Sequence, residues 1–265
     1  MSLRVTILGC GSSGGVPRVG QGWGACDPAE PRNRRRRCSI LVERIGEGGR
    51  TCVLVDTSPD LREQLLSQDV RRLDAILLTH AHADHVHGID DVRPLVIQMR
   101  RRIPLFMDEP TRREVARKFG YVLTSPPGSL YPPLLDARDM HSGVPIRIEG
   151  PGGTLEALPI LFRHGDIDAL GFRFGSLLYS PDVNAVPPES EAALHGLDLW
   201  ILDALRHTPH PSHLTVDQAL ELIARFAPRR GVLTNLHTDL DYGALKAMLP
   251  SGVQPAYDGM EITAG

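Results

Sequence analysis

Residues 80–87 read HAHADHVH, which places four histidines and one aspartate in eight positions. Imidazole and carboxylate groups are the ligands that borderline divalent metals prefer in proteins. His80 and His82 are two residues apart in what we expect to be an extended loop, so both side chains can point toward one ion. Asp84 and His85 fall where the chain turns into a helix, and they can face a second ion. The cluster therefore predicts a metal site.

The element that must position this cluster is residues 74–79, a short continuous apolar run of the kind that forms a buried strand. Further strands are expected at 4–8, 39–42, 52–56, 104–107, 146–148, 155–162, 171–179, 199–203 and 231–235. Helices are expected after Ser58-Pro59-Asp60, over about 84–99 with a disturbance at Pro94, over 110–119, after the N-cap Thr215 and over 242–249. Residues 121–135 carry four prolines and are expected to form a loop. Strands outnumber helices and the two are mixed along the chain, which predicts a layered α/β fold.

The composition limits the classes of function. The 29 Lys and Arg residues nearly balance the 32 Asp and Glu residues, which excludes bulk electrostatic binding to nucleic acid or membrane as the main activity. The first apolar run is too short for a signal peptide, and no run approaches the roughly 18 residues that span a bilayer. We therefore expect a cytoplasmic protein without a membrane partner. The cysteines form no C-x-x-C pair and are expected to be reduced.

The H-x-H-x-D-H motif after an apolar strand resembles the metallo-β-lactamase superfamily. This resemblance implies a four-layer αβ/βα sandwich, in which two mixed sheets are flanked by helices. It also implies ligands at three later strand ends, which this chain fills with His164, Asp182 and His237. One ion would be held by His80, His82 and His164 and a second by Asp84, His85 and His237, with Asp182 bridging them. Asp84 is also a catalytic candidate. Because these positions run from 80 to 237, we expect one domain over residues 1–265.

Two ions about 3.5–4 Å apart can bridge a water, lower its pKa and clamp the oxygens of the attacked group. Such a centre hydrolyses phosphodiesters, lactams, thioesters or lactones. His and Asp ligands suit Zn and Mn alike, so we expect two divalent ions of either kind. Asp56, at the end of the strand 52–56, either orients a ligand histidine or caps the turn that follows it.

Three features favour phosphodiesters. Residues 8–18, LGCGSSGGVPR, together with residues 33–40 resemble the opening of the phosphodiesterase branch of the superfamily, which includes tRNA 3′-processing endonucleases. Asp182 is kept where many lactamases of this fold use Cys. The segment 210–215, HPSHLT, matches the place where that branch carries a histidine that protonates the leaving alkoxide, for which a general acid is useful. We assign this role to His213, with His210 and His207 as alternatives.

Over nearly the whole chain the sequence resembles the phosphoribosyl 1,2-cyclic phosphodiesterase group. This implies attack by a metal-bridged hydroxide on a small cyclic or nucleotide-like phosphodiester, and it implies a homodimer. The chain departs from the group in residues 20–27, where it has one cysteine, Cys26, in place of a Cys-rich zinc site. An RNA-processing nuclease of the same superfamily is the first alternative. We weight it lower and expect no stable nucleic-acid partner, because no long inserted arm is evident. A non-catalytic binding protein of cofactor biosynthesis, as in pyrroloquinoline quinone synthesis, is the second.

The turn at residues 9–14 matches G-x-G-x-x-G, but the sequence after it cannot start a regular helix, so we reject a dinucleotide site. We retain a tight turn whose backbone N–H groups could meet a phosphate. The candidate substrate contacts are Ser12, Ser13, Arg18 and His210. The basic run Arg32 and Arg34 to Arg37 is expected to be mainly a solvated strand edge, whose alternate residues face the core and pair with acids, with one or two phosphate contacts.

Overall fold

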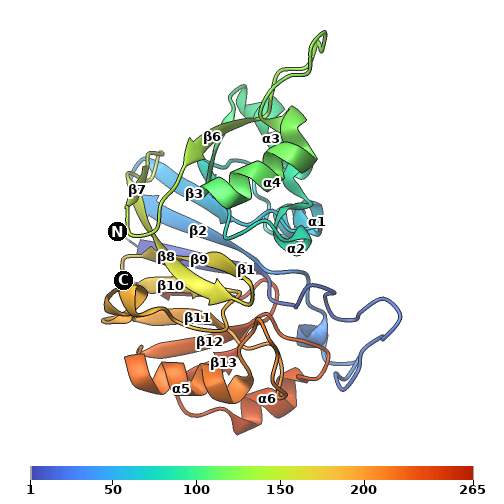
Figure 1. The fold of residues 1–265 in the computed structure, drawn as a ribbon, viewed down its shortest axis with the longest axis vertical. Helices are drawn as coiled ribbons and strands as arrows, with labels where there is room; N and C mark the ends of the chain where they lie inside the picture. Colours follow the sequence, from blue (N-terminus) through green and yellow to red (C-terminus); the bar gives the residue numbers. More distant parts are fainter. Residues whose placement is uncertain (1, 265) are drawn as a thin grey trace.

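The computed structural model describes residues 2–264, in which two seven-stranded sheets stack face to face between two layers of helices (Figure 1). The strand orders are β14-β1-β2-β3-β4-β5-β6 and β13-β12-β11-β10-β9-β8-β7. Each sheet is antiparallel over part of its width and parallel over the rest, so both are mixed. The expected four-layer αβ/βα sandwich is thereby confirmed.

The first sheet contains β1 (Ser2–Gly9), β2 (Ser39–Gly46), β3 (Gly49–Val55), β4 (Ala75–Leu77), β5 (Ile103–Met107), β6 (Leu135–Asp139) and β14 (Glu261–Ala264). Its outer face is covered by α1 (Leu61–Ser67), α2 (Ala83–Val86), α3 (Arg93–Met99) and α4 (Glu109–Phe119) (Figure 1). Short 3₁₀ helices lie at Pro31–Asn33, Ile89–Val92, Gly120–Val122 and Pro188–Leu194.

The second sheet contains β7 (Ile146–Ile148), β8 (Leu155–His164), β9 (Ile167–Phe174), β10 (Leu177–Ser180), β11 (Leu199–Asp203), β12 (Arg230–Thr234) and β13 (Val253–Pro255). Its outer face is covered by α5 (Val216–Phe226) and α6 (Tyr242–Met248) (Figure 1). Helix α5 begins at a capping box, in which Thr215 and Gln218 satisfy each other's backbone N–H groups.

The core consists of three apolar layers. One lies between the sheets and includes Val55, Leu77 and Ile201, all fully buried. The second lies between the first sheet and its helices, and the third lies between the second sheet and α5 and α6. Because both faces of the central strands are covered, β4 and β11 read as continuous apolar runs without alternation.

The parallel halves of the two sheets determine where polar side chains gather. β3 pairs in parallel with β4, and β10, β11 and β12 are also parallel to one another. β8 runs in the same direction as β10 because each is antiparallel to β9. Ligands of open α/β sheets bind beyond the carboxyl ends of such strands. The chain segments that leave β4, β8, β10, β11 and β12 therefore meet at one edge of the sandwich.

Two expected elements are divided in the structure. The helix expected over 84–99 is three short pieces, α2, a 3₁₀ turn and α3. The chain turns at Gly88, where a Cβ would lie 1.9 Å from the carbonyl oxygen of Ser58, and Pro94 falls in the first turn of α3. The run 171–179 is split between β9 and β10, which reverse at Gly175 with φ of 60°. No helix within residues 2–264 has the length and apolar character needed to cross a bilayer.

Candidate metal centre

Three histidines from two elements meet at this edge. His80 and His82 lie in the loop between β4 and α2, and His164 is the last residue of β8. One ring nitrogen from each lies within 4.8 Å of those from the other two. The Nε2 atom of His164 is 3.2 Å from Nδ1 of His82, and its Nδ1 is 2.7 Å from the carbonyl oxygen of Ser212. Nδ1 therefore donates to Ser212, which leaves Nε2 as the coordinating atom.

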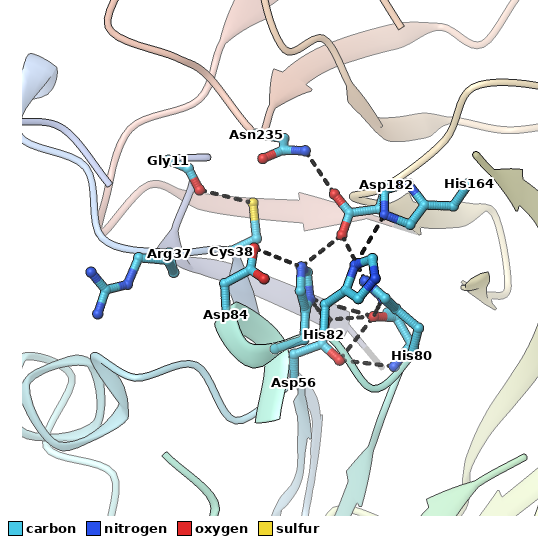
Figure 2. Close-up of polar contacts among 12 residues, drawn as sticks. Gly11, Arg37, Cys38, Asp56, His80, His82, Asp84, His164, Asp182 and Asn235 are labelled. Carbon is cyan, nitrogen blue, oxygen red and sulfur yellow. Dashed lines mark hydrogen bonds and ion pairs between the residues drawn. The ribbon is translucent and has the colours of Figure 1, made fainter. Parts of the chain in front are cut away.

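Asp182 lies between this group and His85. Its Oδ2 is 2.6 Å from Nε2 of His85 and 3.4 Å from Nε2 of His80. Figure 2 shows the Asp182 carboxylate among these side chains, with the amide of Asn235 on its other side. The Oδ2 atom of Asp84 is 3.4 Å from the same Nε2 of His85. One carboxylate oxygen of Asp182 thus approaches both His80 and His85.

His85 is held from the side away from this centre by a buried aspartate. Its Nδ1 is 2.7 Å from Oδ2 of Asp56, whose carboxylate also accepts hydrogen bonds from the backbone N–H and hydroxyl of Thr79. Asp56 follows β3 with φ of 64°, a left-handed conformation that Asp tolerates better than most side chains. Of the two alternatives from the sequence, the structure therefore favours the orientation of a histidine.

The donor set fits bound cations. The Nε2 atom of His80 is buried and has no hydrogen-bond partner within residues 2–264, which is unusual for a buried polar atom. Burial lowers the pKa of His80 well below its usual value, so its ring is neutral and can coordinate. Burial alone lowers the pKa of His85, but the carboxylates of Asp182, Asp56 and Asp84 raise it well above its usual value. The excess of buried carboxylates is the negative charge that divalent ions would neutralise.

His237 follows β12 and lines the cavity beside the same centre. Its Nδ1 is 3.0 Å from Oδ1 of Asp239, and its Nε2 contacts the guanidinium of Arg18. Within residues 2–264, the groups of close ligand atoms include five of the seven predicted ligands, namely His80, His82, His85, His164 and Asp182. Asp84 and His237 line the adjoining cavity but belong to none of these groups.

A further close group joins Asp182 to Asp203 and His213. The Nδ1 atom of His213 is 2.9 Å from Oδ2 of Asp203, which is fully buried at the end of β11. The side-chain amide of Asn235 donates to Oδ1 of Asp182 at 2.7 Å and to Oδ1 of Asp203 at 3.2 Å. Burial lowers the pKa of His213, but contact with Asp203 outweighs this and brings it to about 9.

Sequence reasoning missed Asp203 and Asn235. A signal for both was present, because each ends or follows an apolar strand run in the way that Asp56 does. Asn235 also shares with Asp56 a left-handed backbone, with φ of 62°. Polar residues that close buried strands of this sandwich therefore hold the ligands and the candidate acid.

A cavity of about 200 Å³ connects these groups. It is lined by residues from the turn after β1 and from the ends of β4, β8, β10, β11 and β12: Ser12, Ser13, Arg18, His82, Asp84, His164, Asp182, Leu205, Arg206, His210, Ser212, His213, Asn235 and His237. All four residues that the sequence predicted as substrate contacts lie in this lining. The ring of His210 is 5.0 Å from that of His213, centroid to centroid.

Arg35 ties the loop after β1 to the loop after β12. Its guanidinium donates to the carbonyl oxygens of Leu240 at 2.7 Å and of His237 at 3.3 Å, and to Oδ1 of Asn33 at 3.1 Å. It also lies 3.8 Å from the sulfur of Cys26. Only 2% of Arg35 is exposed, so it is a member of the run that faces the interior, where it meets carbonyl oxygens in place of the expected acid. The next two, which are half-buried, pair with acids: Arg36 with Asp258 and Arg37 with Asp60.

Comparisons with known proteins agree with this arrangement. A family described as a β-lactamase superfamily domain matches residues 51–235. A crystal structure of a diphosphatase from the PhnP family covers all of this chain and 98% of its own, with a TM-score of 0.89 and 35% identity. A coenzyme PQQ synthesis protein B of Xanthomonas oryzae pv. oryzae is 26% identical over 98% of this chain and 99% of its own length. An octanoyltransferase of Porphyromonas gingivalis is 32% identical over 98% of this chain, which spans 51% of that longer protein.

Proposed function

The chain belongs to the metallo-β-lactamase superfamily, and from this premise we propose that it is a metal-dependent phosphodiesterase for small cyclic or nucleotide-like substrates. The observation that carries the proposal is the pairing of His213 with Asp203 beside the clustered ligands. A phosphodiester has a poor alkoxide leaving group, which needs a proton donor at the site of attack.

The metal ligands divide between two positions. His80, His82 and His164 would hold one ion, Asp84, His85 and His237 the other, and Asp182 would be shared. When bound, two divalent ions would stabilise charge on the phosphoryl oxygens and lower the pKa of a water held between them. Asp56 and Ser212 fix the ring orientations of His85 and His164, so that the coordinating nitrogens face the centre.

His213 supplies the proton. Its Nδ1 donates to Asp203, so Nε2 is the atom left to face the leaving oxygen in the cavity. Asp203 stabilises the protonated ring, and Asn235 holds the carboxylates of Asp203 and Asp182 in place through one amide group. This is the arrangement that general acid catalysis requires, in which the acid is kept charged and oriented before substrate arrives.

Two other functions share the fold. The match of almost the whole chain to a coenzyme PQQ synthesis protein supports a role in cofactor biosynthesis, for which a binding protein without turnover is the second alternative. The RNA-processing nuclease remains the other enzymatic alternative. The likeness to a PhnP-family diphosphatase at 35% identity supports hydrolysis of a small phosphate compound instead.

Because ligands come from both sheets, we also propose that one domain carries the whole activity.

One experiment separates these functions. The protein is assayed for metal stoichiometry and then for turnover of bis(p-nitrophenyl) phosphate, a ribose 1,2-cyclic phosphate and a tRNA precursor. We expect two ions and turnover of the small phosphodiesters. Cleavage of the tRNA precursor alone would favour the nuclease. Two ions with no turnover of any of the three would exclude the proposed phosphodiesterase.

A further inference from the structure

The segment that carries His213 contains no helix or strand over residues 206–214, which we call the acid loop. The loop joins β11 to α5. The backbone N–H of Leu205 donates to the carbonyl oxygen of Leu214 at 3.0 Å and closes its base. Asp203 holds the ring of His213 through Nδ1. The backbone that carries this ring must therefore be placed by other contacts.

One such contact is with the turn between β8 and β9. Gly165 in this turn has φ of 66°, and a Cβ there would lie 2.8 Å from the Cβ of Ser212. Glycine thus allows the acid loop to approach the turn closely. Beside it, Nδ1 of His164 donates to the carbonyl oxygen of Ser212 at 2.7 Å. The acid loop therefore packs against the strand end that carries a predicted metal ligand.

Asn184 joins this turn to the acid loop through its side chain. Its Oδ1 accepts the backbone N–H of Gly165 at 3.0 Å, and its Nδ2 donates to the carbonyl oxygen of Pro211 at 3.2 Å. One partner is a donor and the other an acceptor, so a carboxamide satisfies both in a single orientation. The backbone of Asn184 is itself fixed, because its N–H donates to the carbonyl oxygen of Arg163 at 2.8 Å.

Two successive carbonyl groups of the acid loop are thereby held. Asn184 binds that of Pro211, and His164 binds that of Ser212. His213 is the next residue, so its position in the chain follows from these two contacts. Its ring lies 4.7 Å from that of His164, centroid to centroid. A general acid must be within hydrogen-bond reach of the leaving oxygen, so a shift of the loop would remove its effect.

We propose that Asn184 is a positioning residue for the proton donor, which holds the acid loop against the turn after β8 and so keeps His213 beside the candidate metal ligands. This rests on the proposed phosphodiesterase function. Asn184 does not line the cavity, so it acts through His213 and not on the substrate. Its loss should affect only substrates whose leaving group needs a proton.

The test compares two substrates that differ in this need. A ribose 1,2-cyclic phosphate has a sugar alkoxide as leaving group, whereas bis(p-nitrophenyl) phosphate releases p-nitrophenolate, which needs no proton. We expect Asn184→Ala to lower kcat about tenfold or more for the cyclic phosphate and less than about threefold for the aryl ester. Metal content should stay at the wild-type value. An equal loss on both compounds, or a loss of metal, would overturn the positioning role.

Asn184→Asp separates the two contacts of the side chain. The carboxylate can still accept the N–H of Gly165, but it places an oxygen against the carbonyl oxygen of Pro211. The same selective loss is expected. Wild-type kcat for the cyclic phosphate would show that the contact with Pro211 has no role. Ser190→Ala is the matched control, because it removes a 2.7 Å hydrogen bond to Leu161 of β8 and leaves the acid loop untouched.

A double-mutant cycle shows whether Asn184 acts through His213. In the His213→Ala background, Asn184→Ala should lower kcat for the cyclic phosphate no further, because the acid it positions is already gone. Additive losses would overturn the proposal. Failure of the wild-type protein to turn over either compound would instead refute the phosphodiesterase itself.

Hydrogen exchange supplies a readout that needs no turnover. In Asn184→Ala the amides of the acid loop should exchange faster than in the wild-type protein, whereas those of α5 should not change. Faster exchange in both would indicate general destabilisation, and unchanged exchange in the loop would show that Asn184 does not hold it. Either result would contradict the proposal.

Discussion

The Nδ1 atom of His213 lies 2.9 Å from Oδ2 of Asp203, and this buried pair adjoins the carboxylate of Asp182. The contact decides which nitrogen of His213 is available, because Nδ1 is committed to Asp203 and only Nε2 is left for substrate. It also decides the charge of the ring. Burial alone lowers the pKa of His213, whereas contact with Asp203 outweighs this and brings it to about 9. The candidate metal centre therefore has beside it a histidine whose Nε2 can carry a proton toward the cavity.

His213→Ala should lower kcat about 10²- to 10⁴-fold for substrates with alkoxide leaving groups, the range typical of a lost general acid. The loss should be much smaller for p-nitrophenyl esters, whose leaving group needs no proton. His210→Ala, which removes the neighbouring ring from the same cavity lining, tests the alternative acid, and a larger loss there than in His213→Ala would reverse the assignment. Metal content should stay at the wild-type value, and its loss would show that His213 is a ligand.

Asp203→Asn should shift the pH dependence of kcat. A general acid works only while protonated, so kcat falls as the pH rises through the pKa of His213 in the complex. Removal of the carboxylate at 2.9 Å lowers that pKa, because the protonated ring loses its partner. The alkaline limb of the profile should therefore move to lower pH in the variant when an alkyl phosphodiester is the substrate. An alkaline limb that does not move would contradict the assigned pair.

Asp182→Ala should weaken the binding of both ions, whereas His164→Ala should weaken mainly one. The reason is that Asp182 contacts both His80 and His85, while His164 contacts the other histidines of a single group. Calorimetric titration of the metal-free variants with Zn²⁺ gives the stoichiometry and the affinities. Two ions bound by Asp182→Ala with wild-type affinity would refute a shared carboxylate.

Arg35→Met should lower both the stability and the affinity for the second ion. The variant leaves the carbonyl oxygens of His237 and Leu240 without their buried donor, which should cost about 3 kcal/mol or more of the free energy of unfolding. The freed segment also carries His237, so one ion should bind more weakly. Arg34→Met, at an exposed neighbouring position, is the control in urea unfolding and metal titration. Wild-type affinity for both ions in Arg35→Met would contradict this positioning role.

Much of the candidate site could be predicted because apolar strands of this sandwich end in polar residues. The run 74–79 predicts a buried strand, and the histidines after it follow from that strand and their own spacing. The N-cap Thr215 could likewise be predicted, since both residues of its capping box lie within one turn of the chain. Local patterns of this kind need no knowledge of which strands pair.

The partners of the candidate acid could not be predicted, because they depend on pairing between distant strands. Asp203 meets Asn235 because β11 and β12 align in parallel, with Asp203 opposite Thr234. Arg35 belongs to a run of arginines whose inward-facing members are predicted to pair with acids, whereas its partners are carbonyl oxygens of the loop after β12, which no local pattern shows. The left-handed backbone conformation of Asp56 also could not be predicted from the sequence around it.

The central claim is that clustered histidines and aspartates bind divalent ions for phosphodiester hydrolysis, and a reconstitution titration tests it most directly. Protein freed of metal by a chelator is titrated with Zn²⁺ or Mn²⁺ while the release of p-nitrophenolate from bis(p-nitrophenyl) phosphate is followed. The account predicts no turnover without metal and a rate that rises to a plateau at two ions per chain. Binding of two ions with no turnover of this or any other small phosphodiester would contradict it.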